Sequence, residues 1–205
     1  MVKVKICGIR RLEDALVAAE YGADALGFVF YKKSMRFISP SSARKIIKKL
    51  PPFISTVGVF VNPSLEELKR VIEISGIQFV QLHGEENPEL VDDLKIPFIK
   101  GLRIEKKIEE KELKAWKSAS AFLIEGKSEK GYGGTGTGFD YEVVKPFTQN
   151  YRIIIAGGLN PSNVSWVVKR LKPYGVDVSS GVEESPGVKS HKLIKEFIRN
   201  AKSAG

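Results

Sequence analysis

The chain has 205 residues, of which 42% are hydrophobic and 28% are charged, so it is long enough to bury a large core. We expect one domain over residues 1–205. The formal net charge is +9, but the lysines are spread among glutamates, and no basic run is interleaved with aromatic side chains. The missing aromatic residues argue against a nucleic-acid partner, so we expect none; the charge alone fits an anionic small-molecule substrate and a basic binding protein equally well.

Cysteine usage and apolar run length indicate where the protein works. Cys7 is the only cysteine, which excludes a disulfide within the chain and favours a reducing compartment. No apolar run is long enough to span a membrane, and the apolar segment at 2–7 is too short for a signal peptide. We therefore expect a cytoplasmic protein without membrane contact.

Short apolar runs alternate with amphipathic stretches eight times along the chain. We expect strands at 2–7, 25–30, 54–60, 79–82, 98–102, 122–125, 152–156 and 176–178. We expect helices near 12–21, 41–50, 64–74, 87–94, 111–116, 141–147, from 160 onward, and near 191–201. The strand runs are almost continuous in Val, Ile and Phe, which indicates strands buried on both faces. The pattern predicts a parallel (β/α)8 barrel (TIM barrel), with an open doubly wound sheet as the alternative.

Two glycine turns follow the last two expected strands. Gly157 and Gly158 allow backbone N–H groups to approach a ligand closely, and Asn160 is a good N-cap for the next helix. Ser180 and Gly181 open a second short turn of helix. Paired helix N-termini bind anions, so these turns predict a phosphate site; two ordinary strand-to-helix turns are the alternative.

Other motifs are less informative. The segment 131–136, GYGGTG, matches G-x-G-x-x-G, but it begins six residues after a strand, and no acidic residue closes the next strand. It is therefore no dinucleotide site. We interpret 131–138 as a lid whose amides, including Gly134, help hold the phosphate, or else as a plain surface connection. His83, His191 and Cys7 lack the paired spacing of zinc ligands, so we expect no metal.

In a barrel of this kind, function lies at the carboxyl ends of the strands. Chemically active side chains stand at or after these ends: Cys7, Arg36, Gln81, His83, Glu125 and Asp177. A thiol, a carboxylic acid, an arginine and a phosphate site suit proton transfer on a phosphorylated carboxylate substrate.

The chain resembles the phosphoribosylanthranilate isomerase family over nearly its whole length. The strings that carry the resemblance are KICGI at 5–9, GFVFYKKSMRFISP at 27–40, GVFVN at 58–62, VQLHG at 80–84, AGGLNPSNV at 156–164 and VDVSSGVE at 176–183. The resemblance implies a step of tryptophan biosynthesis that uses no cofactor. This step is the Amadori rearrangement of N-(5-phosphoribosyl)anthranilate to 1-(2-carboxyphenylamino)-1-deoxyribulose 5-phosphate.

The resemblance also implies two proton-transfer residues. Cys7 aligns with the general base, although a thiol with a pKa near 8.5 needs a site that favours thiolate. Glu125 aligns with the general acid, where the family has aspartate, so its carboxyl group reaches one methylene further. Without the family, Cys7 is a small buried hydrophobe. An ion pair with Lys100, Arg103 or Lys127 would make Glu125 a poor acid.

Four more residues receive binding roles from the resemblance. Arg36 matches the ligand of the anthranilate carboxylate, which suits a planar guanidinium, and Asp177 would accept hydrogen bonds from substrate hydroxyls. Gln81 and His83 line the family's site.

Two alternative functions stay open at this point. Another phosphosugar barrel, of the epimerase or indole-glycerol-phosphate synthase type, could use a catalytic lysine at a strand end, for which Lys100 is the candidate, whereas Lys5 lies within its strand. A non-catalytic basic binding protein would bind nucleic acid and turn nothing over. The protein is a monomer or a homodimer.

Overall fold

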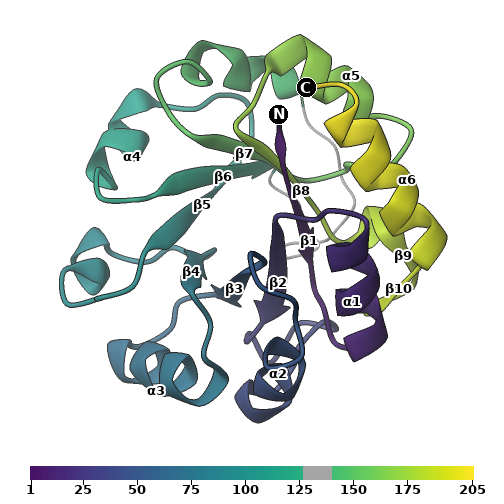
Figure 1. Ribbon diagram of the computed structural model, residues 1–205. Helices are drawn as coiled ribbons and strands as arrows, with labels where there is room; N and C mark the ends of the chain where they lie inside the picture. The colour runs from purple at the N-terminus through teal and green to yellow at the C-terminus, as the bar shows by residue number, and fades with distance from the viewer. Residues whose placement is uncertain (127–139) are drawn as a thin grey trace.

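Eight parallel strands close into a barrel in the order β1 to β8 (Figure 1). This computed structural model describes residues 1–126 and 140–205. The strands are β1 (Lys3–Cys7), β2 (Ala25–Val29), β3 (Ser55–Phe60), β4 (Phe79–Leu82), β5 (Phe98–Ile104), β6 (Ala121–Gly126), β7 (Ile153–Ile155) and β8 (Gly175–Val178). The barrel closes where β1 pairs with β8 and Lys5 lies opposite Asp177. The predicted (β/α)8 barrel is confirmed, and the open sheet is wrong.

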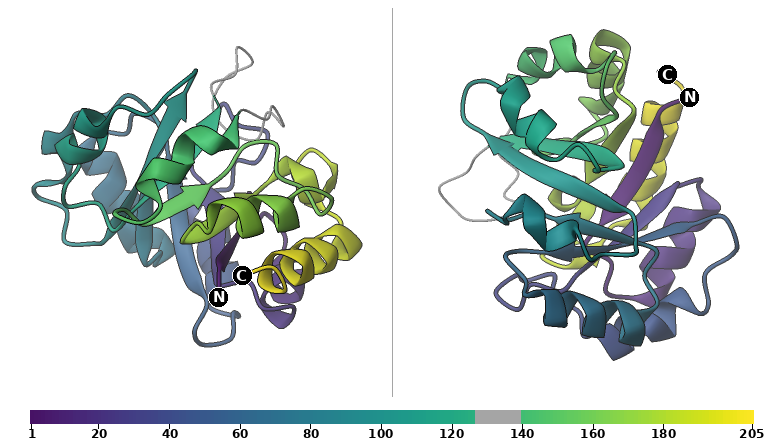
Figure 2. Two further views of the ribbon diagram at one scale, coloured as in Figure 1. Left: turned by 90° about the horizontal axis from the view of Figure 1, so that it is seen from above. Right: turned by 90° about the vertical axis from the view of Figure 1, so that its left-hand side faces the viewer.

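The connecting elements form a ring outside the barrel (Figures 1 and 2). They are α1 (Leu12–Glu20), α2 (Pro40–Ile47), α3 (Leu65–Ser75), η1 (Pro88–Val91), α4 (Glu110–Ala115), η2 (Tyr141–Phe147), α5 (Val164–Leu171), η3 (Ser180–Val182) and α6 (His191–Lys202). Two short strands, β9 (Glu183–Ser185) and β10 (Val188–Lys189), pair antiparallel between η3 and α6. None of the helices in these described ranges is long and apolar enough to cross a membrane.

Three expected helices differ from the structure. The segments expected at 87–94 and 141–147 are 3-10 helices, η1 and η2, and η2 contains Pro146, which removes a backbone donor. The helix expected from 160 begins at Val164, because the side chains of Asn160 and Asn163 form a turn first. Asn163 Oδ1 accepts from the backbone N–H of Asn160 at 2.9 Å, and Asn160 Oδ1 accepts from that of Ser162 at 2.8 Å.

Residues of each strand alternate between two packed layers. One set faces outward and packs against the helices, as Val4 and Ile6 of β1 do, both fully buried. The inward set forms a small apolar layer inside the barrel: Val57, Ile99, Ala121, Leu123, Ile154 and Ala156. Above this layer the inward positions become polar, and that change places the site at the carboxyl ends of the strands.

Candidate active site

One small cavity at the carboxyl ends of the strands collects the side chains that the sequence singled out. Its volume is about 60 Å³. The predicted residues that line it are Cys7, Arg36, Gln81, His83, Glu125 and Asp177. All of them are buried, which strengthens their mutual electrostatic interactions. The structure therefore brings together side chains from β1, β4, β6 and β8 and from the segment after β2.

Glu125 lies at one side of this cavity in a hydrogen-bonded chain. His83 Nε2 is 2.8 Å from Glu125 Oε1, and Gln81 Nε2 is 3.1 Å from His83 Nδ1. Gly101 leaves space for the imidazole, since a Cβ there would lie 2.3 Å from His83 Nδ1. Gln81 Oε1 is the buried side-chain oxygen that lacks a hydrogen-bond partner within the described ranges. This oxygen is available to a ligand in the cavity.

Two of the three cations considered as alternative partners of Glu125 have carboxylate partners of their own. Lys100 Nζ lies 2.5 Å from Glu86 Oε2 and 2.7 Å from the Gly84 carbonyl oxygen. Arg103 Nη2 lies 2.7 Å from Glu85 Oε1. Lys127, the third candidate, is outside the described residues.

Cys7 lies across the cavity, where charged groups surround it. Burial raises the pKa of the Cys7 thiol, while Lys5 and Lys189 oppose that rise and Asp177 adds to it. Lys5 Nζ donates to Asp177 Oδ1 at 2.8 Å, so the carboxylate expected to bind substrate hydroxyls is engaged by a buried lysine.

Arg36 forms a bidentate ion pair that the sequence did not predict. Its Nε and Nη2 donate to the two oxygens of Glu183, at 2.8 and 2.7 Å. Lys189 Nζ donates to Glu183 Oε1 at 2.8 Å, and the side chain of this lysine is completely buried. Burial works against ionisation of Glu183, but Arg36 and Lys189 outweigh it and lower the pKa of Glu183. Glu183 closes the string VDVSSGVE, which was the signal available in the sequence.

The two glycine turns lie side by side beyond β7 and β8. Gly157, Gly158, Ser180 and Gly181 line a recess of about 30 Å³, next to Glu125 and Asp177. Gly157 and Gly158 have φ of 79° and 71°, which disfavours other residues. A Cβ on Gly181 would lie 1.9 Å from the Leu159 carbonyl oxygen, so the turns touch.

The first turn of this recess differs from the one expected. Since α5 begins only at Val164, the first turn presents loop amides rather than the start of a helix. Gly134, the fifth predicted phosphate residue, and the expected lid at 131–138 lie outside the described residues.

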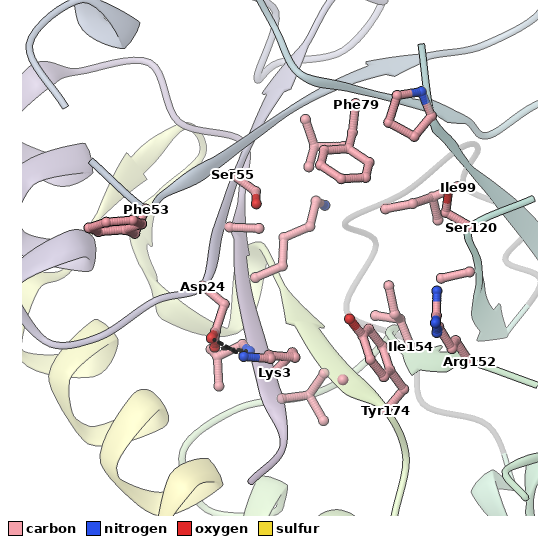
Figure 3. Close-up of a pocket in the computed structure, with 18 residues that line it drawn as sticks. Lys3, Asp24, Phe53, Ser55, Phe79, Ile99, Ser120, Arg152, Ile154 and Tyr174 are labelled. Carbon is pink, nitrogen blue, oxygen red and sulfur yellow. Dashed lines mark hydrogen bonds and ion pairs between the residues drawn. The ribbon is translucent and has the colours of Figure 1, made fainter. Parts of the chain in front are cut away.

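A much wider cavity than the one among the predicted site residues lies at the opposite end of the barrel (Figure 3). It measures about 520 Å³ and is lined by the first residues of the strands, among them Val57, Phe79, Ile99 and Ile154. In (β/α)8-barrel enzymes the catalytic residues lie at the carboxyl ends of the strands, so we assign no catalytic role to this cavity at the amino ends. Across the residues that the structure describes, no three His, Cys, Asp or Glu side chains group to hold a metal ion, and the absence of metal and cofactor stays a prediction.

The closed barrel, with buried acid, thiol and arginine at the carboxyl ends of its strands, defines a (β/α)8-barrel enzyme. Comparison with known proteins then gives the family. The sequence model described as "N-(5'phosphoribosyl)anthranilate (PRA) isomerase" matches residues 4–200. The chain belongs to the phosphoribosylanthranilate isomerase family.

Individual relatives agree with this assignment. N-(5'-phosphoribosyl)anthranilate isomerase of Thermotoga neapolitana is 48% identical over 205 residues, covering 98% of this chain and 99% of the relative. A crystal structure of phosphoribosylanthranilate isomerase in complex with reduced 1-(o-carboxyphenylamino)-1-deoxyribulose 5-phosphate has 43% identity and a TM-score of 0.88, covering 99% and 100%. A structure of monomers generated from the dimeric enzyme of Thermotoga maritima has 41% identity and a TM-score of 0.85, also covering 99% and 100%.

Proposed function

We infer that the protein is an isomerase of tryptophan biosynthesis that converts N-(5'-phosphoribosyl)anthranilate to 1-(2-carboxyphenylamino)-1-deoxyribulose 5-phosphate. The family match over residues 4–200 carries this inference. It favours this reaction over the other phosphosugar barrels and over a basic binding protein. The lack of any membrane-crossing helix in the described part of the chain and the single thiol support a cytoplasmic enzyme.

The two proton-transfer groups divide the reaction between them. Glu125 protonates the furanose oxygen while the C1–O bond breaks and the nitrogen lone pair forms the C1=N double bond. The Cys7 thiolate then removes the proton from C2, and the electron pair forms the C1=C2 bond of an enolamine. Loss of the proton from the C2 hydroxyl and protonation at C1 give the ketone. The positions of Cys7 and Glu125 in one buried cavity support these roles.

The ends of the substrate bind to different parts of the site. The phosphate lies in the recess between Gly157-Gly158 and Ser180-Gly181, where backbone N–H groups neutralise it without a basic side chain. The anthranilate carboxylate lies against Arg36. Glu183 takes Nε and Nη2 and so fixes the guanidinium plane, which leaves Nη1 to donate to the substrate.

A direct assay tests the proposed reaction. Substrate generated in situ from anthranilate and phosphoribosyl pyrophosphate should be consumed by the purified protein, with the fluorescence of phosphoribosylanthranilate as the readout. The gene should also restore growth without tryptophan to a strain that lacks this isomerase. Absence of turnover in a folded preparation would refute the proposal.

The amino-terminal end of the barrel supports a homodimer. Phe53 precedes β3, is 99% exposed and has φ of 69°, an unfavourable conformation for an aromatic residue. It lies at the rim of the 520 Å³ cavity, whose walls include Val57, Phe79 and Ile154 (Figure 3). In a two-fold dimer, each copy presents both an aromatic side chain and an apolar cavity, so Phe53 of one chain fills the cavity of the other. The dimeric relative from Thermotoga maritima is consistent with this assembly.

A further inference from the structure

Lys5 is a buried cation for which the acid–base scheme above has no role. It stands two residues before Cys7 on β1, and in a strand such residues point to the same side. Its side chain is 4% exposed, and its ammonium group donates to Asp177 Oδ1 at 2.8 Å. Burial opposes a charge on Lys5, but Asp177 and Cys7 outweigh it and raise the pKa of the amine. Lys5 is therefore a fixed positive charge inside the barrel.

The ammonium group of Lys5 and the thiol of Cys7 meet beside Gly27. Gly27 of β2 lies opposite Cys7 in the register of β1 and β2. A Cβ on Gly27 would be 2.8 Å from Cys7 Sγ and 3.1 Å from Lys5 Nζ, so both groups occupy space that the glycine leaves open. Both groups therefore face the same open space beside Gly27.

The surroundings of Cys7 need such a cation. Asp177 on β8 faces the thiol, and Glu125 and His83 line the same cavity. Lys189 on β10 lowers the pKa of Cys7 less than Lys5 does. Lys189 and Arg36 are also both paired with the carboxylate of Glu183. A substrate with a phosphate and a carboxylate adds further negative charge, which disfavours a thiolate. Lys5 is the cation best placed to oppose these effects.

We propose that Lys5 is a positioning residue that stabilises the thiolate of Cys7, and that Asp177 holds the ammonium group in place for this purpose. The proposal rests on the role of Cys7 as general base. Lys5 transfers no proton to or from the substrate. It keeps its charge throughout, while Asp177 compensates that charge when Cys7 is a neutral thiol.

The test measures the thiol directly. Cys7 is the only cysteine, so alkylation by iodoacetamide reports this group alone. In Lys5→Met the pH midpoint of alkylation should rise by about one unit or more, since an opposite charge at this distance shifts a pKa by that amount. The acid limb of kcat/KM should move with it, giving a loss of about tenfold or more near neutral pH that is recovered at higher pH. Lys5→Arg keeps the charge and should keep the midpoint, as should Lys45→Met, which removes an exposed lysine on α2.

A second pair of variants covers loss of folding. If Lys5→Met leaves Asp177 unpaired and unfolds the barrel, Lys5→Met/Asp177→Asn removes both charges. Compared with Asp177→Asn alone, the double variant should again show a higher alkylation midpoint. An unchanged midpoint in a folded variant overturns the proposal, as does an equal loss of activity at every pH. An active Cys7→Ala enzyme would instead overturn the assignment of the base and leave the measured coupling of Lys5 to the thiol intact.

Discussion

The side chain of Glu125 is long enough to reach His83. Its Oε1 reaches His83 Nε2 at 2.8 Å, and that bond orients a carboxyl group that is one methylene longer than the aspartate implied by the family. The backbone of β6 still pairs in register with β5, with Glu125 opposite Arg103. The extra methylene is therefore accommodated inside the cavity and not by a break in the strand.

We expect Glu125→Gln to lower kcat by about a hundredfold or more, because the amide can donate a hydrogen bond but is not acidic enough to transfer a proton to the furanose oxygen. Glu125→Asp retains the acid and should keep or improve activity. Steady-state kinetics on both variants gives the comparison, and circular dichroism checks the fold. A glutamine variant as active as the parent would move the acid elsewhere, with Asp177 as the next candidate.

The Glu183 carboxylate predicts a pH dependence. Its pKa lies below the ordinary value of 4.5, so its ion pair contributes stability that is complete above that value. This contribution is lost as the pH falls below 4.5 through the lowered pKa of the folded state. We expect thermal unfolding temperatures to fall more steeply with acid in the parent than in Glu183→Gln. Parallel acid profiles for the two proteins would show that the pair adds nothing to stability.

Two elements, the turns after β7 and β8, function as one unit because they touch. Gly181 packs directly against the Leu159 carbonyl oxygen and leaves no room for a side chain between the two turns. The carbonyl oxygen of Gly158 accepts a hydrogen bond from Asn163 Nδ2 at 2.9 Å, which holds this residue in place. This hydrogen bond and the contact between the turns define the shape of the recess.

Gly181→Ala should therefore separate the turns. Overpacking of this kind costs about 1–3 kcal/mol of stability, and we expect KM to rise more than kcat falls, since the phosphate binds ground and transition states alike. Gly175→Ala is the matched control, because its Cβ meets Lys3 O at 3.1 Å at the far end of β8. It should lower stability without changing KM. Equal effects of both variants on KM would contradict a phosphate role for the turn.

Much at this scale was predictable from local sequence. The buried Val, Ile and Phe runs predicted every barrel strand, and Gly157-Gly158 and Ser180-Gly181 predicted the paired turns. The β9–β10 hairpin was missed. The Arg36–Glu183 pair was also missed, because these two side chains are 147 residues apart and meet only once the barrel closes. The Lys5–Asp177 pair was missed for the same reason, at a separation of 172 residues.

At the scale of the whole molecule, the two ends of the barrel have different tasks. The carboxyl ends of the strands hold a tight cavity of about 60 Å³ lined by the predicted site residues. The amino ends hold a wider cavity of about 520 Å³, lined mainly by apolar side chains but also by Lys3, Asp24 and Arg152. The one-domain organisation stays a prediction. Our proposed dimer uses the apolar end and leaves the active site open to substrate.

Phe53→Ser should accordingly shift the protein from two chains to one in light scattering or sedimentation, while the activity per chain is kept. The reason is that serine cannot fill the apolar cavity of the partner. Trp166→Ser on α5, where the side chain is 53% exposed, is the control and should leave the assembly unchanged. A parent protein that sediments as a single chain at every concentration would exclude the dimer.

The chain from Gln81 through His83 to Glu125 has a direction that a proton can reverse. When the Gln81 amide nitrogen donates to Nδ1, the neutral imidazole carries its hydrogen on Nε2, and Glu125 accepts it as a carboxylate. When Glu125 is protonated and donates to Nε2, the hydrogen moves to Nδ1, and the amide must turn its oxygen toward the ring. The orientation of the Gln81 amide thus depends on whether Glu125 is protonated. Nitrogen chemical shifts of the His83 imidazole would distinguish the two forms, which differ in heavy-atom positions only by the half-turn of the Gln81 amide.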